Sequence, residues 1–257
     1  MTNFNYFFIF IFGLAIGSFL NVLIDRLPAE ESIGGRSHCD NCKKTLKWID
    51  LIPVFSWVYL RGKSRCCHKK ISIFYPIVEL LTGFLFVIVY ISLPTFASSI
   101  PLLTSHFLIL ILISALVVIF FSDLKYHIIP DEMTILLVII GIMLIFLRQS
   151  FFDYLFGALL LSLIMYGIYA VTRGKGMGFG DVKLAFPMGL ILGLKAGFIA
   201  LYLSFIIGGF FSLLLIIIHK RNLKSKIAFG PFMIIGFALM FFYNDPILNF
   251  IQNHFGF

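Results

Sequence analysis

The stretch ILILISALVVIFFSD, residues 109–123, is apolar up to Phe121 apart from Ser114, and it ends on the carboxylate of Asp123. A membrane-spanning helix needs about 20 mostly apolar residues, and the apolar residues from position 102 onward extend the stretch to that length. An ionised Asp at the centre of a bilayer costs roughly 2.5–3.5 kcal/mol, so acids near membrane depth tend to face a wet, functional interior. The stretch therefore predicts a membrane helix that ends in a functional acid.

The whole chain shares this apolar character. Its 257 residues are 60% hydrophobic and 12% charged, whereas soluble domains are about 45–50% apolar. We predict an all-α, polytopic bundle with membrane segments at residues 4–24, 73–93, 102–121, 134–148, 152–171, 184–194, 197–218 and 229–251. The 184–194 segment is short, and Pro187, Gly189 and Gly193 predict that its helix is broken. The first run lacks a cleavage site and should remain as an anchor.

The basic residues predict an orientation. Suppose that loop 25–71 lies on the same side of the membrane as loops 122–133, 172–183 and 219–227. That side then holds 18 of the 20 Lys and Arg residues, and only Arg148 and Lys195 lie on the other side. The positive-inside rule then places the long loop in the cytoplasm of the cell and both termini outside. The net charge of +8 is scattered over loops without a basic-aromatic platform, so we expect no nucleic-acid partner, only membrane lipid around the spans.

All four cysteines lie in the long loop, at Cys39, Cys42, Cys66 and Cys67. A cytoplasmic loop is in a reducing compartment, which favours metal ligation over disulfides. The C-x-x-C pair of Cys39 and Cys42 has the spacing that a tetrahedral zinc ion needs. We expect the loop to form a small folded lobe only if a cross-link such as a metal ion holds it together. The chain shows no convincing internal repeat.

Asp123 and Asp181 are predicted to lie at the same cytoplasmic membrane edge. Two neighbouring carboxylates share one proton, which gives one base to activate water and one acid to protonate a carbonyl or a leaving amine. Such a pair hydrolyses peptides without a metal or a covalent intermediate. The structural alternatives are an interfacial charge for Asp123 and a helix N-cap for Asp181.

Glycines alternate before Asp181, at Gly174, Gly176, Gly178 and Gly180. Without Cβ atoms such a segment lets another backbone approach closely, so Gly178 and Gly180 are candidates for a loop along which a substrate strand approaches the acid. A flexible loop is the alternative. The spacing fits neither phosphate-binding glycine motif.

These residues belong to six blocks through which the chain resembles the prepilin leader peptidases of the G-x-G-D class of membrane aspartyl proteases. The blocks run in the family's order and cover positions 17–28, 50–57, 75–83, 123–131, 178–184 and 229–232. The resemblance implies that Asp123 and Asp181 are the catalytic pair. It also implies that the substrates are type IV prepilin or pseudopilin precursors, with a basic leader that is cut after Gly at the cytoplasmic face.

The resemblance implies two cofactors that peptide hydrolysis itself does not require. Some family members methylate the new N-terminus with S-adenosylmethionine, although no binding site for it is evident in this sequence. Family members often carry a second C-x-x-C pair, which here would run from Ser64 to Cys67, so the first thiol is missing and Cys66 is additional. A zinc site of Cys39, Cys42 and Cys67 completed by Cys66 or His68, and a metal-free loop held by packing, both remain open.

Two other functions could use parts of this pattern. Another G-x-G-D protease, such as a signal-peptide peptidase, fits poorly with the short loops and the 25–71 insertion. A proton- or cation-coupled transporter could use the same two aspartates. Glu79 is expected either to line the active cavity or to pair with a basic residue. The domains are predicted as a first membrane helix at 1–24, a cytoplasmic lobe at 25–71 and a peptidase core at 72–257.

Overall fold

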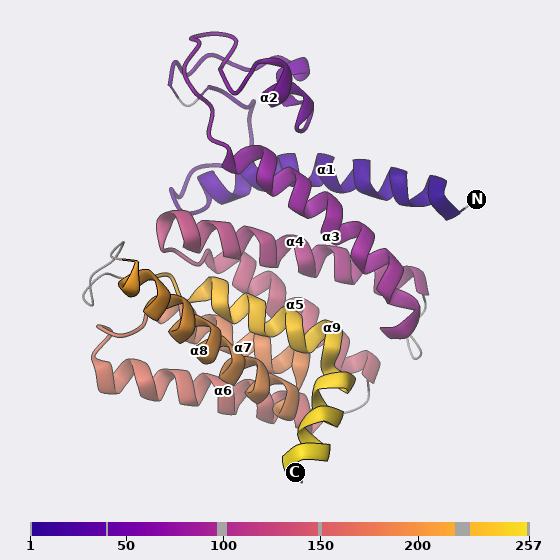
Figure 1. The fold of residues 1–257 in the computed structure, drawn as a ribbon, viewed down its shortest axis with the longest axis vertical. Coiled ribbons are helices and arrows are strands. Elements are labelled where there is room, and N and C mark those ends of the chain that lie inside the picture. Colours follow the sequence, from indigo (N-terminus) through magenta and orange to yellow (C-terminus); the bar gives the residue numbers. More distant parts are fainter. Residues whose placement is uncertain (1, 40, 97–101, 149–150, 219–226, 256–257) are drawn as a thin grey trace. The chain divides into compact units, whose positions relative to one another are not determined.

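The structure is a computed structural model that describes residues 2–39, 41–96, 102–148, 151–218 and 227–255. The chain divides into two compact units, Met1–Val118 and Ile119–Phe257. The long helices among the described residues lie where the apolar segments predicted them, and Figure 1 shows them as α1 (Thr2–Arg26), α3 (Phe74–Phe96), α4 (Leu102–Tyr126), α5 (Asp131–Arg148), α6 (Phe151–Thr172), α7 (Phe179–Leu192), α8 (Leu194–Ile217) and α9 (Gly230–Phe255).

In the first unit, α1 and α3 pack against each other at glycines. A Cβ atom on Gly13 would lie 2.7 Å from the Cα of Gly83, and one on Gly17 would lie 2.7 Å from the Cα of Glu79. Real Cβ atoms do not approach other atoms this closely, so only glycine permits the contact. Small residues spaced four apart are a common way for membrane helices to bring their backbones together.

The segment between α1 and α3 forms a lobe with two short helices, η1 (Trp48–Leu51) and α2 (Phe55–Tyr59). It has two isolated antiparallel β-bridges, His38 with Thr45 and Lys63 with Lys70. Figure 1 shows this lobe in purple, joined to α1 and α3 at its two ends. The lobe is therefore tethered at both ends to membrane helices.

In the second unit, α7 is surrounded by α5, α6, α8 and α9. The backbones of α6 and α7 meet at Gly157 and Gly189, where a Cβ on Gly189 would lie 2.5 Å from the carbonyl carbon of Gly157. Leu190 packs in a buried cluster with Ala158 and Ile145. The short α7 is thus enclosed by protein, which is the environment that an irregular or short membrane helix requires.

The prediction of a broken helix at 184–194 is correct at Gly193 but wrong at Pro187 and Gly189. Helix α7 runs from Phe179 to Leu192 with Pro187 inside it, and it ends at Gly193, whose φ of 81° favours glycine. A proline in a helix interior removes one backbone hydrogen bond and costs about 3 kcal/mol in water-soluble helices. Packing on the enclosed α7 compensates for this loss, and the helix begins early enough to include Asp181.

Five of the helices have the length and composition of membrane spans, in α1, α3, α4, α6 and α8, and a shorter apolar helix covers Gly230–Asn244. Large apolar side chains on several helices are exposed, including Phe146 and Phe152. Lipid accommodates such exposed side chains, whereas water would not. The chain is a multi-pass helical membrane protein, as its composition predicts. The loop 219–226, which contributes to the predicted orientation, lies outside the described residues.

Candidate active site

Asp123 lies in the last turn of α4 and is buried, with 6% of its surface exposed. Its Oδ2 atom accepts a hydrogen bond of 2.9 Å from the backbone N–H of Gly230, 107 positions away at the start of α9. Its backbone carbonyl accepts the N–H of His127, whose φ of 56° accompanies the end of the helix. The carboxylate is therefore held at the junction between the end of α4 and the start of α9.

Asp181 lies in the first turn of α7 and is equally buried, at 6% exposed. Gly178 is the N-cap residue, and its backbone N–H donates to Asp181 Oδ2 over 3.1 Å. Asp181 is therefore the third residue of the helix, reaching back to the cap, rather than the N-cap itself. A carboxylate in this position is favoured by the unpaired N–H groups and the dipole of a helix N-terminus.

The two aspartates are linked through shared packing around Ile129. Ile129 packs against Gly180, which precedes Asp181, and against Gly230, which binds Asp123: a Cβ on Gly180 would lie 3.2 Å from the Ile129 Cβ, and one on Gly230 would lie 3.3 Å from its Cδ1. The structure thus brings together Asp123 and Asp181, as the sequence predicted. Two buried carboxylates that interact can divide the roles of acid and base.

Gly230 was part of a recognised block, but sequence reasoning did not identify it as the partner of Asp123. A Cβ at Gly230 would lie 2.6 Å from Asp123 Oδ2. The hydrogen bond comes from the backbone, so the residue type at position 230 gives no direct signal of it. The only available signal was glycine itself, which often marks a close approach.

The glycine segment before Asp181 has internal packing partners. Gly178 caps α7, Gly180 faces Ile129, and Gly174 lies beside the ring of Tyr169 with a φ of 71°. Approach of a substrate strand along Gly178 and Gly180 stays a prediction.

Near the site, an ion pair joins the starts of α5 and α7. Lys183 Nζ lies 2.8 Å and 2.9 Å from the two carboxylate oxygens of Asp131. Asp131 is the first residue of α5, and the Pro130 carbonyl accepts the first helical hydrogen bond from Thr134. Asp131 is therefore an exposed partner of Lys183 and not a buried acid.

Glu79 lies on α3, in the first unit. Its carboxylate on α3 is buried and accepts a hydrogen bond of 2.7 Å from the backbone N–H of Val54 in the lobe. Val54 has a φ of 60°, unusual for a β-branched residue, in a tight turn where Phe55 N–H donates to the Pro53 carbonyl. Glu79 therefore fixes a strained turn of the lobe to the membrane helix.

The four cysteine sulfurs of the lobe gather in one place. All of them lie within 4.8 Å of one another, with Cys39 and Cys67 at 3.7 Å and Cys42 and Cys66 at 2.9 Å. Four sulfurs around a zinc ion with bonds of about 2.3 Å would be separated by roughly 3.8 Å. Adjacent Cys66 and Cys67 both turn toward the cluster, and the exposed His68 is not part of it. The cluster can bind a metal ion.

The cysteines sit on two turns that repeat each other. In the first turn Cys39 N–H donates to the Lys44 carbonyl and Lys43 N–H donates to the Cys39 carbonyl. In the second, Ser64 and Lys69 replace Cys39 and Lys44, and His68 replaces Lys43. Lys43 and His68 also share a positive φ, at 57° and 55°. The prediction that the chain has no internal repeat is therefore wrong for the lobe.

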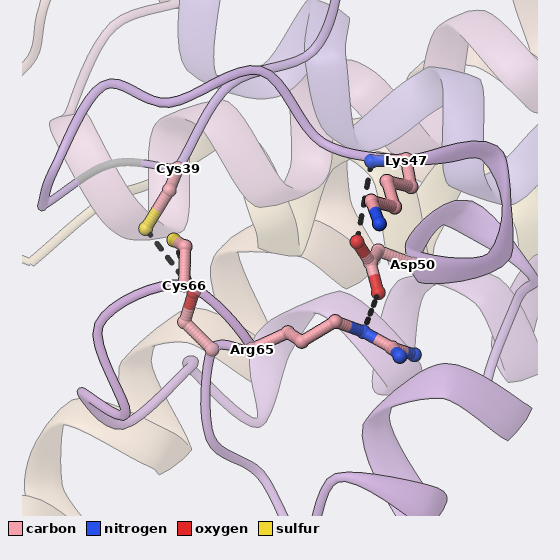
Figure 2. A network of polar contacts seen from close by, with 6 residues as sticks. Cys39, Lys47, Asp50, Arg65 and Cys66 are labelled. Atoms are coloured by element: carbon pink, nitrogen blue, oxygen red, sulfur yellow. Dashed lines mark hydrogen bonds and ion pairs between the residues drawn. The ribbon is translucent and has the colours of Figure 1, made fainter.

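Ser64 occupies the place of the thiol that the second turn lacks. Its hydroxyl is buried, 3.3 Å from Cys39 Sγ and 3.0 Å from Cys66 Sγ, and Figure 2 shows Cys39 and Cys66 facing each other there. The Ser64 hydroxyl lowers the pKa of the Cys39 thiol to about 6, which favours the thiolate that binds metals. The Cys66 side chain, in contrast, raises the pKa of the Cys42 thiol to about 11.

Two family models and several known proteins match this chain. The family model "Bacterial Peptidase A24 N-terminal domain" matches residues 11–93, and "Type IV leader peptidase family" matches residues 110–213. The prepilin leader peptidase/N-methyltransferase of Aeromonas hydrophila is 32% identical to this chain, over 96% of the chain and 93% of that protein. The protein of the same name from Bacillus subtilis (strain 168) is 32% identical, over 94% and 96% of the two chains.

No solved structure matches the chain. Together, the two family models cover the lobe, both aspartates and most of the helices. The alignments with these two relatives cover nearly the whole chain. The chain therefore belongs to the type IV leader peptidase family.

Proposed function

We propose that this protein is a prepilin leader peptidase, an aspartyl endopeptidase in which Asp123 and Asp181 are the catalytic pair. One observation carries the proposal: two buried aspartates lie close to Ile129, and each accepts a hydrogen bond from the backbone N–H of a glycine, Gly230 or Gly178. The names of the relatives support the substrate class, because they are called prepilin leader peptidases.

In this mechanism the pair holds one proton. The unprotonated carboxylate takes a proton from water as the water oxygen attacks the scissile carbonyl carbon, and the protonated carboxylate donates to the carbonyl oxygen. Collapse of the tetrahedral intermediate then passes a proton to the leaving amine nitrogen. The backbone N–H groups of Gly178 and Gly230 keep the two acids oriented throughout.

We place this reaction at the cytoplasmic edge of the cell membrane. Asp123 lies in the last turn of α4 and Asp181 in the first turn of α7, which are positions near helix ends rather than helix centres. A precursor whose hydrophobic helix lies in the membrane would present its basic leader to the cytoplasm. The scissile bond after Gly would then reach the acids without moving the charged leader across the bilayer.

Two accessory chemistries belong to the proposal. The relatives are also named N-methyltransferases, which supports methylation of the new N-terminal amine by S-adenosylmethionine. The cysteine cluster supports a structural zinc ion held by Cys39, Cys42, Cys66 and Cys67. Zinc bound there would cross-link the lobe and stabilise its fold, which so small a lobe needs.

The test is cleavage of a purified prepilin by Asp123→Asn, by Asp181→Asn and by the double variant, followed by mass spectrometry. Each single variant should lose nearly all cleavage, because one carboxylate cannot both activate water and protonate the leaving group. The double variant should be hardly slower than either single variant, since residues that act as one unit are not additive.

Asp131→Asn is the matched control, because it makes the same chemical change in an exposed carboxylate. Losing its ion pair with Lys183 should cost about 0–1 kcal/mol of stability and leave cleavage largely intact. An Asp123→Asn protein that still releases the leader at a near-normal rate would exclude the pair as the catalytic group. It would favour the transporter alternative for the two aspartates.

A further inference from the structure

The lobe carries an apolar surface that the described protein leaves uncovered. The side chains of Phe55, Val58 and Tyr59 on α2 are 60%, 60% and 69% exposed, and Trp48 on the adjoining η1 is 75% exposed. Residues three and four apart share one face of a helix, and the rings of Phe55 and Tyr59 stack with centroids 6.0 Å apart. We call Trp48, Phe55, Val58 and Tyr59 the aromatic face.

The segment of chain that carries this face is strongly basic. Between residues 43 and 70 the chain has a single acidic residue, Asp50. The basic residues of this segment are all exposed, and they are Lys43, Lys44, Lys47, Arg61, Lys63, Arg65, Lys69 and Lys70. Asp50 is already paired: its Oδ1 lies 2.7 Å from Arg65 Nε and its Oδ2 accepts the Lys47 N–H, as Figure 2 shows.

We propose that the aromatic face of the lobe docks on the anionic lipid headgroups of the membrane that holds the protein. Trp and Tyr prefer the interface between membrane and water because one end of each side chain is apolar and the other is polar. Clusters of Lys and Arg beside an apolar face bind anionic lipid surfaces. Both ends of the lobe join membrane helices, so this surface is within its reach.

The charge pattern disfavours two other partners for the aromatic face, namely the leader peptide of a substrate and a second copy of the chain. A basic leader peptide would meet like charges around the aromatic face, and so would the same face of a second copy of the chain. Anionic headgroups complement the basic residues and leave the rings to enter the acyl boundary. The Glu79 bond to Val54, directly before Phe55, fixes this part of the lobe to α3 and limits how it can turn.

Tryptophan fluorescence tests the proposal in the full-length protein, because both tryptophans of the chain, Trp48 and Trp57, lie in the lobe. Trp57→Phe leaves Trp48 as the probe on the aromatic face. Trp48→Phe leaves Trp57, which donates to the Ile71 carbonyl and contacts Gly62, as a probe inside the lobe. Each variant is placed in nanodiscs of phosphatidylcholine with or without phosphatidylglycerol, with bromine atoms on the acyl chains.

We expect Trp48 emission to shift to shorter wavelength when phosphatidylglycerol is present. The brominated acyl chains should then quench it about twofold more than they do without phosphatidylglycerol, and 1 M salt should reduce that difference. Charge reversal by Lys43→Glu with Lys44→Glu should abolish the difference. Unchanged Trp57 emission in that variant would show that the lobe remains folded.

Equal, weak quenching of Trp48 in both lipids, with full access to water-soluble acrylamide, would overturn the proposal. Emission that changes only with two copies in a nanodisc would assign the face to a dimer. Emission that changes only when prepilin is added would assign it to the substrate. Either result would refute lipid docking.

Discussion

The two proposed catalytic acids are held by different kinds of contact. Asp181 takes its hydrogen bond from Gly178, three positions earlier, and so depends only on the start of its own helix. Asp123 takes its bond from Gly230, on a helix far along the chain. A change at position 230 should therefore act on Asp123 without altering the local fold of either acid.

Gly230→Ala should greatly reduce prepilin cleavage. The added Cβ would lie 2.6 Å from Asp123 Oδ2, so either the carboxylate or the start of α9 must move. A misplaced catalytic group of about 1 Å can cost roughly 100-fold in rate. Cleavage rates measured with saturating prepilin, together with thermal unfolding in detergent, would separate lost chemistry from lost folding.

Gly209→Ala is the matched control for Gly230→Ala. A Cβ at Gly209 on α8 would meet no atom within 4 Å, and alanine favours a helix over glycine by about 1 kcal/mol. This variant should cleave normally. Normal cleavage by Gly230→Ala would show that the Gly230 contact does not position Asp123.

At the residue scale, a physical reason made the two aspartates candidates, and the resemblance to the family implied their catalytic role. A carboxylate next to a long apolar run is costly unless it has a function, so Asp123 and Asp181 stood out from the other acids. The hydrogen bond from Gly230 could not be predicted, because a backbone donor 107 positions away leaves no local pattern. The bond between Glu79 and Val54 was missed for the same reason.

At the element scale, the two cysteine turns share a backbone pattern that their side chains only partly reveal. The repeat consists of backbone hydrogen bonds and positive φ angles, which several residue types can supply. Cys39 corresponds to Ser64 and Lys43 to His68, so side-chain identity conceals the relation. The sequence left Cys66 and His68 open as the fourth ligand, and the turn directs the sulfurs of both Cys66 and Cys67 into the cluster.

The zinc proposal leads to a compensating pair of substitutions. The wild-type protein should contain about one zinc ion per chain, and Cys39→Ser or Cys66→Ser should lower that content by removing a ligand. Adding Ser64→Cys to Cys66→Ser should restore it, because the Ser64 hydroxyl already lies 3.3 Å from Cys39 Sγ. Elemental analysis of purified protein measures the result.

Ser64→Cys alone is the control for the restored thiol, and it should keep the wild-type zinc content. A wild-type protein without zinc but with full cleavage activity would show that the lobe folds without metal. Full zinc content in Cys66→Ser would instead exclude Cys66 as a ligand.

At the scale of the whole molecule, apolar runs predicted where the helices lie because lipid requires long helical segments. At α7 the sequence correctly predicted an end at Gly193, but it wrongly predicted interruptions at Pro187 and Gly189. Burial of α7 among four other helices depends on contacts between distant segments. Such contacts cannot be read from the hydropathy of one segment.

The orientation of the molecule can be tested with two lysines on opposite predicted sides. Lys175 precedes α7 and Lys195 lies in the first turn of α8, and both are exposed. Because α7 separates them, they should face opposite sides of the membrane, with Lys175 on the basic, cytoplasmic side. Lys195→Cys should react with a membrane-impermeant maleimide in intact cells, and Lys175→Cys should react only after the membrane is opened.

The native lobe cysteines give the background for this experiment, and they should also be protected in intact cells. Opening the membrane in the presence of a chelator should expose them, because a metal ion would otherwise mask their thiolates. Labelling of Lys175→Cys but not Lys195→Cys from outside would invert the orientation. Because the proposed acids begin α7 and end α4, that result would also move the cleavage site to the outer face, where a basic leader must cross the bilayer before it is cut.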